Sequence, residues 1–207
     1  MTPEELLLRC ATVSASGFIY WGGVLILARR VRKQIGRSPN LKPRGTKEKA
    51  LWIAWFVVIL SWIGQPFLAG GSASGPVLHL FPALLNSTTL ALGLGLVTLG
   101  YAATLWCYAA MGNTWRIGVN TKEKTTLVSN GPYRWVRHPI YLFQIVMLAG
   151  AALLLPTAAS FAILILHCIC AQIKAADEEN YLLKIHGDAY HDYMSRTGGL
   201  FPRFLRG

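Results

Sequence analysis

Residues 129–141 read SNGPYRWVRHPIY and combine turn formers with aromatic and basic side chains between two apolar runs. Gly131 and Pro132 end any helix that arrives from upstream. Pro139 fits the first turn of a new helix, because the N–H that proline lacks would have no intrahelical acceptor there. Arg137 and His138 would then flank a helix N-terminus, where free N–H groups and the helix dipole favour an anion. The alternative for this stretch alone is a basic loop on lipid headgroups.

Five apolar segments are arranged around this stretch. They cover residues 10–28, 50–69, 84–111, 139–155 and 157–173. The first three reach the roughly 20 residues that span a bilayer. The last two are shorter and joined at Pro156, which predicts a helical hairpin whose full crossing the sequence leaves open. We therefore predict an all-α polytopic membrane bundle of about five transmembrane helices. It would form one domain over 1–207, with three N-terminal spans in 1–111 and a catalytic core in 112–207.

Small residues recur in the third apolar segment at Gly93, Gly95 and Gly100. Glycine lets membrane helices approach each other closely. A nucleotide-binding loop is not expected there, because such a loop follows a strand. We predict a close helix–helix contact along this segment.

The distribution of charge predicts an orientation. Lys and Arg number 20 against nine Asp and Glu, and all but Arg9 fall in 29–49, in 116–137 or after residue 173. Five spans with the N-terminus outside place these segments on one side, which the positive-inside rule makes cytoplasmic. The positive excess thus indicates orientation and contact with membrane lipids, and nucleic-acid binding is not expected. We predict an integral membrane protein, in the cell inner membrane if bacterial.

The four cysteines, Cys10, Cys107, Cys168 and Cys170, all lie in apolar runs. None has zinc-ligand spacing with a histidine, so we expect neither a metal site nor a disulfide framework. Glu4 and Glu5 precede the first apolar run, which argues against the basic start of a signal peptide.

A second cluster of polar and aromatic residues follows the last apolar segment. It contains Lys174, Asp177, Glu178, Glu179, Leu182, His186, Gly187, Tyr190, Tyr193 and Arg196. Together with 131–141 it resembles the isoprenylcysteine carboxyl methyltransferase and phospholipid methyltransferase family. That family's pattern is G-P/V-Y, R-H-P-x-Y, a short apolar hairpin, E-E-x-x-L, F-G-x-x-Y-x-x-Y and a basic residue. The resemblance covers roughly residues 111–204, and the combination of the two clusters makes it specific.

The resemblance implies S-adenosylmethionine as cofactor, with C-terminal cytoplasmic helices closing its site. By resemblance, the cofactor-binding positions are Thr125, Thr126, Leu127, Val128, Tyr133, His138, Pro139, Ile140, Tyr141 and Glu178. The chemistry of the residues is compatible, because an aromatic slot from Tyr133, Trp135 and Tyr141 suits an adenine. Helix-terminal N–H groups and His138 suit a carboxylate, and Glu178 suits an ammonium or a ribose.

The predicted catalytic residues are Lys174, Glu179 and Arg196. Lys174 precedes Glu178 by one helical turn and shares its face; the family usually has Arg at this position, near the methyl acceptor. The alternative for Lys174 is a simple interfacial ion pair. Arg196 matches the basic residue after the paired tyrosines and is predicted to orient substrate or close the pocket, the alternative being a lipid headgroup contact.

The methyl acceptor implied by the resemblance is an isoprenylcysteine-like carboxylate on a lipophilic substrate that enters from the bilayer. A carboxylate needs no general base, whereas an amine or thiol would make Glu179 or His186 candidate bases. Phe143 stands where the family often has Gly, which predicts a reshaped acceptor tunnel. His167 is polar within an apolar run and either lines the acceptor site or hydrogen-bonds a neighbouring helix.

Three other functions stay open at this stage. Phosphatidylethanolamine N-methylation is the nearest. An NADPH-dependent sterol- or steroid-type reductase would use Arg134 and Arg137 for the extra phosphate, although the Glu178–Glu179 pair disfavours a polyanion. A non-catalytic membrane scaffold or small transporter would need functional polar residues at mid-membrane, which the second and third segments almost lack. The sequence leaves the oligomeric state undetermined.

Overall fold

The computed structural model describes residues 1–35, 45–69, 75–112 and 127–203. Over these ranges the regular structure is helical, and only isolated bridges occur besides it. The α-helices are α1 (Pro3–Ile35), α2 (Gly45–Gly64), α3 (Ser87–Met111), α4 (Pro139–Leu154), α5 (Ala158–His186) and α6 (Asp188–Arg196). Short 3-10 turns are η1 (Gln65–Phe67), η2 (Pro76–Leu78), η3 (Pro82–Leu84) and η5 (Gly131–Arg134). The predicted all-α membrane bundle is confirmed.

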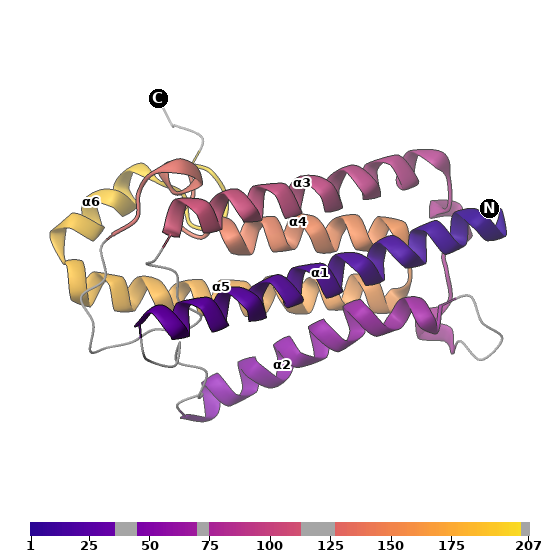
Figure 1. Ribbon diagram of the computed structural model, residues 1–207, viewed down its shortest axis with the longest axis horizontal. Coiled ribbons are helices and arrows are strands. Elements are labelled where there is room, and N and C mark those ends of the chain that lie inside the picture. Colours follow the sequence, from indigo (N-terminus) through magenta and orange to yellow (C-terminus); the bar gives the residue numbers. More distant parts are fainter. Residues whose placement is uncertain (36–44, 70–74, 113–126, 204–207) are drawn as a thin grey trace.

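Helices α1 to α5 lie lengthwise along one another, and α6 sits at one end of the bundle (Figure 1). Successive helices reverse direction, so the start of α4, the end of α5 and α6 share what we call the site end. The start of α1, the start of α3 and the α4–α5 turn share the opposite, far end. The described basic side chains other than Arg9 belong to site-end segments, as the charge pattern predicts. Which membrane face this end occupies remains a prediction.

Four helices, α1, α2, α3 and α5, are long and apolar enough to cross a membrane. Helix α4 has 16 residues, which corresponds to about 24 Å and is shorter than a hydrocarbon core of roughly 30 Å. The predicted hairpin is therefore asymmetric: α4 is short, whereas α5 runs without a break from Ala158 to His186. Gly187, at φ +52°, ends α5 and allows α6 to begin, as predicted.

Glycines bring α3 and α4 into close contact. A Cβ at Gly100 would lie 2.6 Å from Cγ of Met147, and one at Gly93 would lie 2.7 Å from Cγ of Leu154. Gly150 supplies the reciprocal small residue on α4, 2.8 Å from the carbonyl oxygen of Gly93 by the same measure. The predicted helix contact is confirmed for Gly93 and Gly100. Gly95 is not part of it, since it has open space around it.

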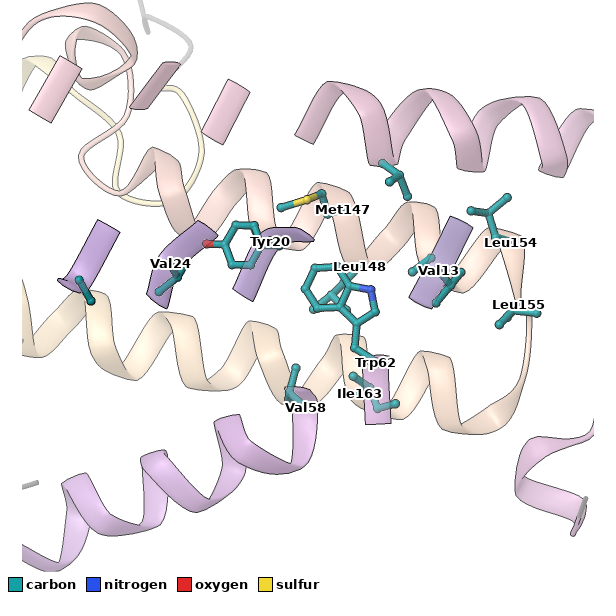
Figure 2. Packing of buried hydrophobic residues seen from close by; sticks show 13 residues of the cluster. Val13, Tyr20, Val24, Val58, Trp62, Met147, Leu148, Leu154, Leu155 and Ile163 are labelled. Carbon is teal, nitrogen blue, oxygen red and sulfur yellow. The ribbon is translucent and has the colours of Figure 1, made fainter. Parts of the chain in front are cut away.

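The apolar core lies between α1, α2, α4 and α5 (Figure 2). Trp62 of α2 is its largest member and is 1% exposed. Its ring stacks on Tyr20 of α1 with a centroid distance of 6.0 Å, and its indole N–H donates to Ser16 Oγ. These contacts hold α1 and α2 together.

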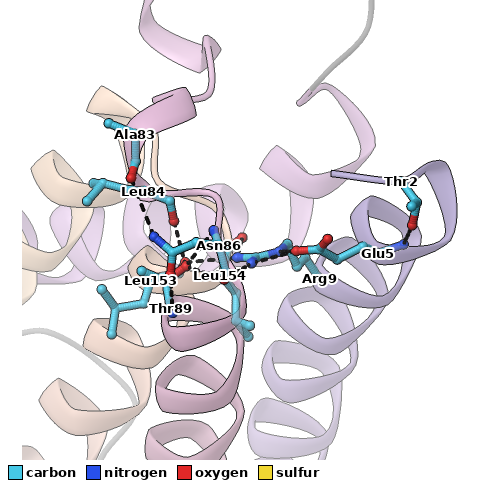
Figure 3. Close-up of polar contacts among 9 residues, drawn as sticks. All are labelled: Thr2, Glu5, Arg9, Ala83, Leu84, Asn86, Thr89, Leu153 and Leu154. Carbon is cyan, nitrogen blue, oxygen red and sulfur yellow. Dashed lines mark hydrogen bonds and ion pairs between the residues drawn. The ribbon is translucent and has the colours of Figure 1, made fainter.

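Arg9 holds the far end together (Figure 3). Its guanidinium is fully buried and donates to the carbonyl oxygens of Leu153 and Leu154 at 3.3 Å and of Asn86 at 2.7 Å. Glu5, one turn earlier on α1, accepts from it at 2.8 Å. The last carbonyls of a helix have no intrahelical donor. Arg9 therefore caps the short helix α4 at the point where solvent or lipid would otherwise meet those groups.

Candidate functional site

The two polar clusters of the sequence meet at the site end. The hydroxyl of Tyr141 on α4 donates to Glu178 Oε1 on α5 at 2.8 Å. His138 lies between the two glutamates, with Nδ1 3.4 Å from Glu178 and Nε2 3.2 Å from Glu179. Its ring stacks on Tyr141 with a centroid distance of 6.0 Å. These four side chains form what we call the Glu178 cluster.

Local sequence positions the residues of this cluster. His138 is the residue before α4, and Pro139 occupies the first position of the helix, as the sequence predicts. Tyr141 therefore leaves the first turn of α4, where N–H groups have no intrahelical acceptor. On α5, Lys174 and Glu178 lie one turn apart on one face. Lys174 is buried, and among the described residues no hydrogen bond or ion pair of its ammonium is found.

The C-terminal segment closes over the start of α4 from one side. The backbone N–H groups of Arg137 and His138 donate to the carbonyl oxygens of Gly198 and Gly199 at 2.9 and 3.2 Å. The Arg137 side chain donates to the carbonyls of Met194 and Thr197. The backbone N–H groups of Arg137 and His138 themselves are therefore not free for an anion. A ligand anion at this helix start would have to use the N–H groups of the next residues.

Arg137 also binds the second glutamate of the site. Its Nε lies 2.8 Å from Glu179 Oε1, so this carboxylate is shared between Arg137 and His138. Gly198 must be a glycine here, because a Cβ would overlap the carbonyl oxygen of Phe201. The result is a rigid corner formed by α4, α5 and the end of α6.

Electrostatics at this corner favour a protonated histidine. Burial alone would lower the pKa of His138, but hydrogen bonds and charges from Glu178 and Glu179 outweigh it and raise the pKa above its usual value. Burial also raises the pKa of Tyr193 to about 12. Its neutral hydroxyl donates to the carbonyl oxygen of Tyr133 at 2.6 Å. This bond fixes α6 on the turn that precedes α4.

Comparison with known proteins agrees with this arrangement. The phospholipid methyltransferase family matches residues 88–189, a range that includes α3, α4, α5 and the Glu178 cluster. Through these residues the chain belongs to the phospholipid methyltransferase family. With its four membrane-spanning candidates, this family member is an integral membrane protein.

Three relatives are similar to part of this chain. The nickel-cobalt-cadmium resistance protein NccN of Alcaligenes xylosoxydans xylosoxydans is 28% identical over 119 residues, covering 58% of this chain and 52% of its own. The cobalt-zinc-cadmium resistance protein CzcN of Cupriavidus metallidurans is 27% identical over 114 residues, covering 55% and 49%. Protein-S-isoprenylcysteine O-methyltransferase of Schizosaccharomyces pombe is 27% identical over 164 residues, covering 74% and 67%. The chain thus spans about half the length of the two resistance proteins.

Several predicted cofactor positions gather at the corner. Tyr133, His138, Pro139 and Glu178 lie there with Tyr141, and Ile140 belongs to the same first turn of α4. Leu127 and Val128 are half-buried in the approach to η5. Thr125 and Thr126 lie outside the described residues. The individual roles remain predictions.

The three predicted catalytic residues are placed differently. Lys174 faces the bundle interior beneath Glu178 and belongs to the buried face of α5. Glu179 is held by Arg137 and His138. Arg196 is exposed, and its Nε donates to the carbonyl oxygen of Asp192 on its own helix. The structure therefore groups the first two with the cluster, and it does not bring Arg196 into it.

Two features of the corner were missed at the sequence level. Trp55 of α2 lies against Tyr141 with ring centroids 6.1 Å apart, a contact that no sequence pattern indicated. Trp135, expected in an aromatic slot, is 48% exposed and packs on Trp106 instead. The sequence around Trp55 does not indicate its partner, because the packing of α2 on α4 determines which ring it contacts.

The donor set suits the cofactor that methyltransferases of this kind imply. The hydroxyl of Tyr133 is buried and has no partner among the described residues, so a polar ligand group beside η5 would satisfy it. Glu178 keeps lone pairs beyond its bonds to Tyr141 and His138. No cluster of metal-ligand side chains was found within the described ranges.

Proposed function

We propose that this membrane protein transfers a methyl group from S-adenosylmethionine to a lipophilic acceptor, with an isoprenylcysteine-like carboxylate as the leading acceptor. One observation carries the proposal: the Glu178 cluster stands at the start of α4, with the buried cation of Lys174 one turn away on the interior face of α5. An anionic holder for a cationic cofactor and a cation for an anionic acceptor thus lie side by side. The match to the methyltransferase family supports the same chemistry.

The residues of the corner would hold the cofactor by complementary charge. S-adenosylmethionine, when bound, supplies an electrophilic methyl group on a positively charged sulfur. Glu178 would bind the ammonium or the ribose, kept in place by Tyr141 and His138. The N–H groups of Ile140 and Tyr141 would receive the carboxylate, since a helix N-terminus favours an anion. Closure by the segment after α6, held through Arg137, would exclude water from this side.

Lys174 would orient the acceptor carboxylate. A single ammonium attracts a carboxylate but lacks the two-pronged geometry of arginine, so neighbouring groups would have to fix its direction. A carboxylate nucleophile requires no proton removal, which agrees with a Glu179 already bound by Arg137 and His138. The remaining task is alignment of the two reactants, and alignment alone is a large source of rate enhancement.

Phosphatidylethanolamine N-methylation is the second candidate, because the matching family is described as phospholipid methyltransferase. An amine acceptor would need a base, and Glu179 or His186 would have to supply it. The reductase alternative is weaker: Arg137 is bound to Glu179 and to two carbonyls, and Arg134 stacks on Trp135 at 4.8 Å. Both arginines assigned to a cofactor phosphate are therefore engaged.

The decisive experiment is calorimetry of S-adenosylhomocysteine binding to the purified protein in detergent. We expect wild type to bind, and Glu178→Ala and His138→Ala to bind at least about tenfold more weakly. Glu4→Ala and His79→Ala are matched controls, because both residues are exposed at the far end. Methylation of a prenylated cysteine, compared with formation of choline lipid from phosphatidylethanolamine, then separates the two acceptors. Well-folded wild type that binds NADPH and no S-adenosylhomocysteine would overturn the proposal.

A further inference from the structure

Buried polar atoms without partners continue beneath the Glu178 cluster into the membrane part of the bundle. Four of these atoms, from three residues on different helices, are Trp55 Nε1 on α2, Gln144 Oε1 on α4 and both ring nitrogens of His167 on α5. Among the described residues none of these atoms has a hydrogen-bond partner. Buried polar atoms in native proteins are nearly always paired, so three such groups together require a reason.

Trp55 belongs to the immediate surroundings of the cluster. Its ring lies 6.1 Å from that of Tyr141, whose hydroxyl binds Glu178. Trp55 precedes Trp62 by seven residues, which places both on one face of α2. Trp62 stacks on Tyr20 of α1, so this face of α2 looks into the bundle. The unpaired N–H of Trp55 is therefore an interior donor.

Gln144 lies one turn below Tyr141 on α4 and is 7% exposed. Its amide donates to the hydroxyl of Tyr20, which lies 3.1 Å from the hydroxyl of Tyr108 on α3. An amide has one oxygen and one nitrogen on opposite sides. Whichever of them faces Tyr20, the other stays unpaired. The position of this orphan group does not depend on how the amide is oriented.

The depth of His167 follows from the register of α2 on α5. Gln65 accepts from Ser160 at 3.1 Å at one end, and Lys47 pairs with Asp177 at 2.6 Å at the other. His167, seven residues after Ser160, is thus level with the position seven residues before Gln65. Trp55 lies only three residues further toward the site end, about 4.5 Å along the axis. The unpaired groups of α2 and α5 therefore share one depth in the bundle.

We infer that Trp55, Gln144 and His167 form the binding site for the polar head of the methyl acceptor, and that this head carries a hydrogen-bond-accepting oxygen. The indole N–H is a donor only, so an ammonium group cannot satisfy it, whereas a carboxylate or carbonyl oxygen can. Gln144 also donates to that oxygen when its amide is turned over, so that the amide oxygen accepts from the Tyr20 hydroxyl. The apolar remainder of the acceptor would lie along the membrane helices. This inference rests on the proposed methyl transfer and adds to it the residues and the chemical class that select the acceptor.

The inference assigns acceptor choice partly to a segment that the family match does not include. Residues 88–189 hold Gln144 and His167, whereas Trp55 and the Tyr20 partner of Gln144 come from α2 and α1. Members of the family that share the Glu178 cluster can then differ in acceptor through their first two helices. Trp55 and Gln144 are specificity residues in this proposal; they take no part in bond making.

The test compares Trp55→Phe and Gln144→Leu with wild type in detergent. Two probes with the same farnesyl chain are used, one ending in an S-linked cysteine carboxylate and one in an ammonium. We expect each substitution to weaken binding of the carboxylate probe about tenfold and to leave S-adenosylhomocysteine affinity within about twofold. Trp55→Phe removes an unpaired buried N–H, so the unfolding temperature of this variant should stay the same or rise. Gln144→Leu also removes the bond to the Tyr20 hydroxyl, so its unfolding temperature should fall slightly.

Matched substitutions keep the result interpretable. Trp52→Phe on the exposed side of α2 and Gln172→Leu on the exposed side of α5 should change neither affinity. Equal affinity of both probes for wild type, or unchanged affinity of the carboxylate probe in both interior variants, would overturn the acceptor site while S-adenosylhomocysteine still binds. Loss of S-adenosylhomocysteine binding by wild type would instead overturn the proposed function.

Discussion

The two ends of the bundle bury charged groups in opposite ways. At the far end Arg9 is completely buried, and Glu5 together with three backbone carbonyls accepts its hydrogen bonds. At the site end Lys174 is buried with no partner found among the described residues, and Tyr133 keeps an unpaired hydroxyl. A buried basic side chain thus has its hydrogen-bond acceptors at the far end, whereas one at the site end is left available for a ligand.

This difference separates structure from function within one fold. A buried charge is tolerated when its donors are matched by fixed acceptors. Arg9 meets that condition with groups of the chain itself, so it stabilises the short helix α4. For Lys174 and the Glu178 cluster, a bound ligand would supply the matching groups. We therefore expect substitutions at the far end to change stability, and substitutions at the site end to change binding.

Arg9→Met should have the largest effect on stability. It leaves the carboxylate of Glu5 and the carbonyls of Leu153, Leu154 and Asn86 without their buried donor. Removing one partner of a buried charged network costs about 3 kcal/mol of unfolding free energy. Thermal unfolding in detergent measures this, and calorimetry below the transition should show unchanged S-adenosylhomocysteine affinity. A variant as stable as wild type would show that the far end does not depend on Arg9.

Arg137→Met should lower both stability and binding. The change removes the ion pair with Glu179 and the donors to Met194 and Thr197, which we expect to cost about 2 kcal/mol. The segment after α6 would then be held by the backbone bonds of Gly198 and Gly199 to residues 135–138, and S-adenosylhomocysteine affinity should fall several-fold. Arg137→Lys should restore part of the stability. Loss of stability with unchanged affinity would mean that the segment after α6 does not close the cofactor site.

Local sequence signals predicted the helix boundaries at the site end well. Pro139 begins α4 and Gly187 separates α5 from α6, because proline and glycine restrict or release the backbone directly. The glycines of α3 predicted its contact with α4 for the same reason: a missing side chain permits a close approach. These features depend on a residue and its immediate neighbours, so a single sequence contains them.

The partners of charged residues were not predictable in this way. Arg9 was expected only to lie on the opposite side from the other basic residues, and its role as the cap of α4 depends on a contact across 144 and 145 residues. Likewise the predicted helix start at Pro139 gave no sign that the carbonyls of Gly198 and Gly199 accept from the backbone N–H groups of Arg137 and His138. The meeting of residues 133–141 with 174–179 came from the family resemblance, since no local pattern links the two segments.

Tyr141→Phe should affect the site end alone and by a smaller amount. It removes the 2.8 Å hydrogen bond that orients Glu178 and keeps the ring between His138 and Trp55. One such bond is worth about 1 kcal/mol, so S-adenosylhomocysteine should bind about fivefold more weakly. Tyr101→Phe is the matched control, because Tyr101 lies on α3 and packs against the apolar core. Equal effects of the two substitutions on affinity would argue against an orienting role.

Changing pH should act on the site end and leave the far end unaffected. Burial lowers the pKa of His138, but the hydrogen bonds and charges of Glu178 and Glu179 raise it by more. The folded-state pKa of His138 therefore lies above the ordinary value near 6.5. Protonated His138 then adds stability that is fully present below the unfolded pKa and is lost as pH rises through the folded pKa. The other groups that face it are Arg137, which is bound to Glu179, and the hydroxyl of Tyr141, which is bound to Glu178.

The measurement is unfolding temperature against pH for wild type and His138→Gln. Wild type should lose stability from about pH 6.5 upward, whereas the variant should show a flatter profile there. Arg9→Met should keep the slope of wild type at a lower temperature, because Arg9 and Glu5 pair at the far end, away from His138. A slope that persists in His138→Gln would place the titrating group elsewhere. A slope that vanishes in Arg9→Met would show that the two ends do not unfold independently.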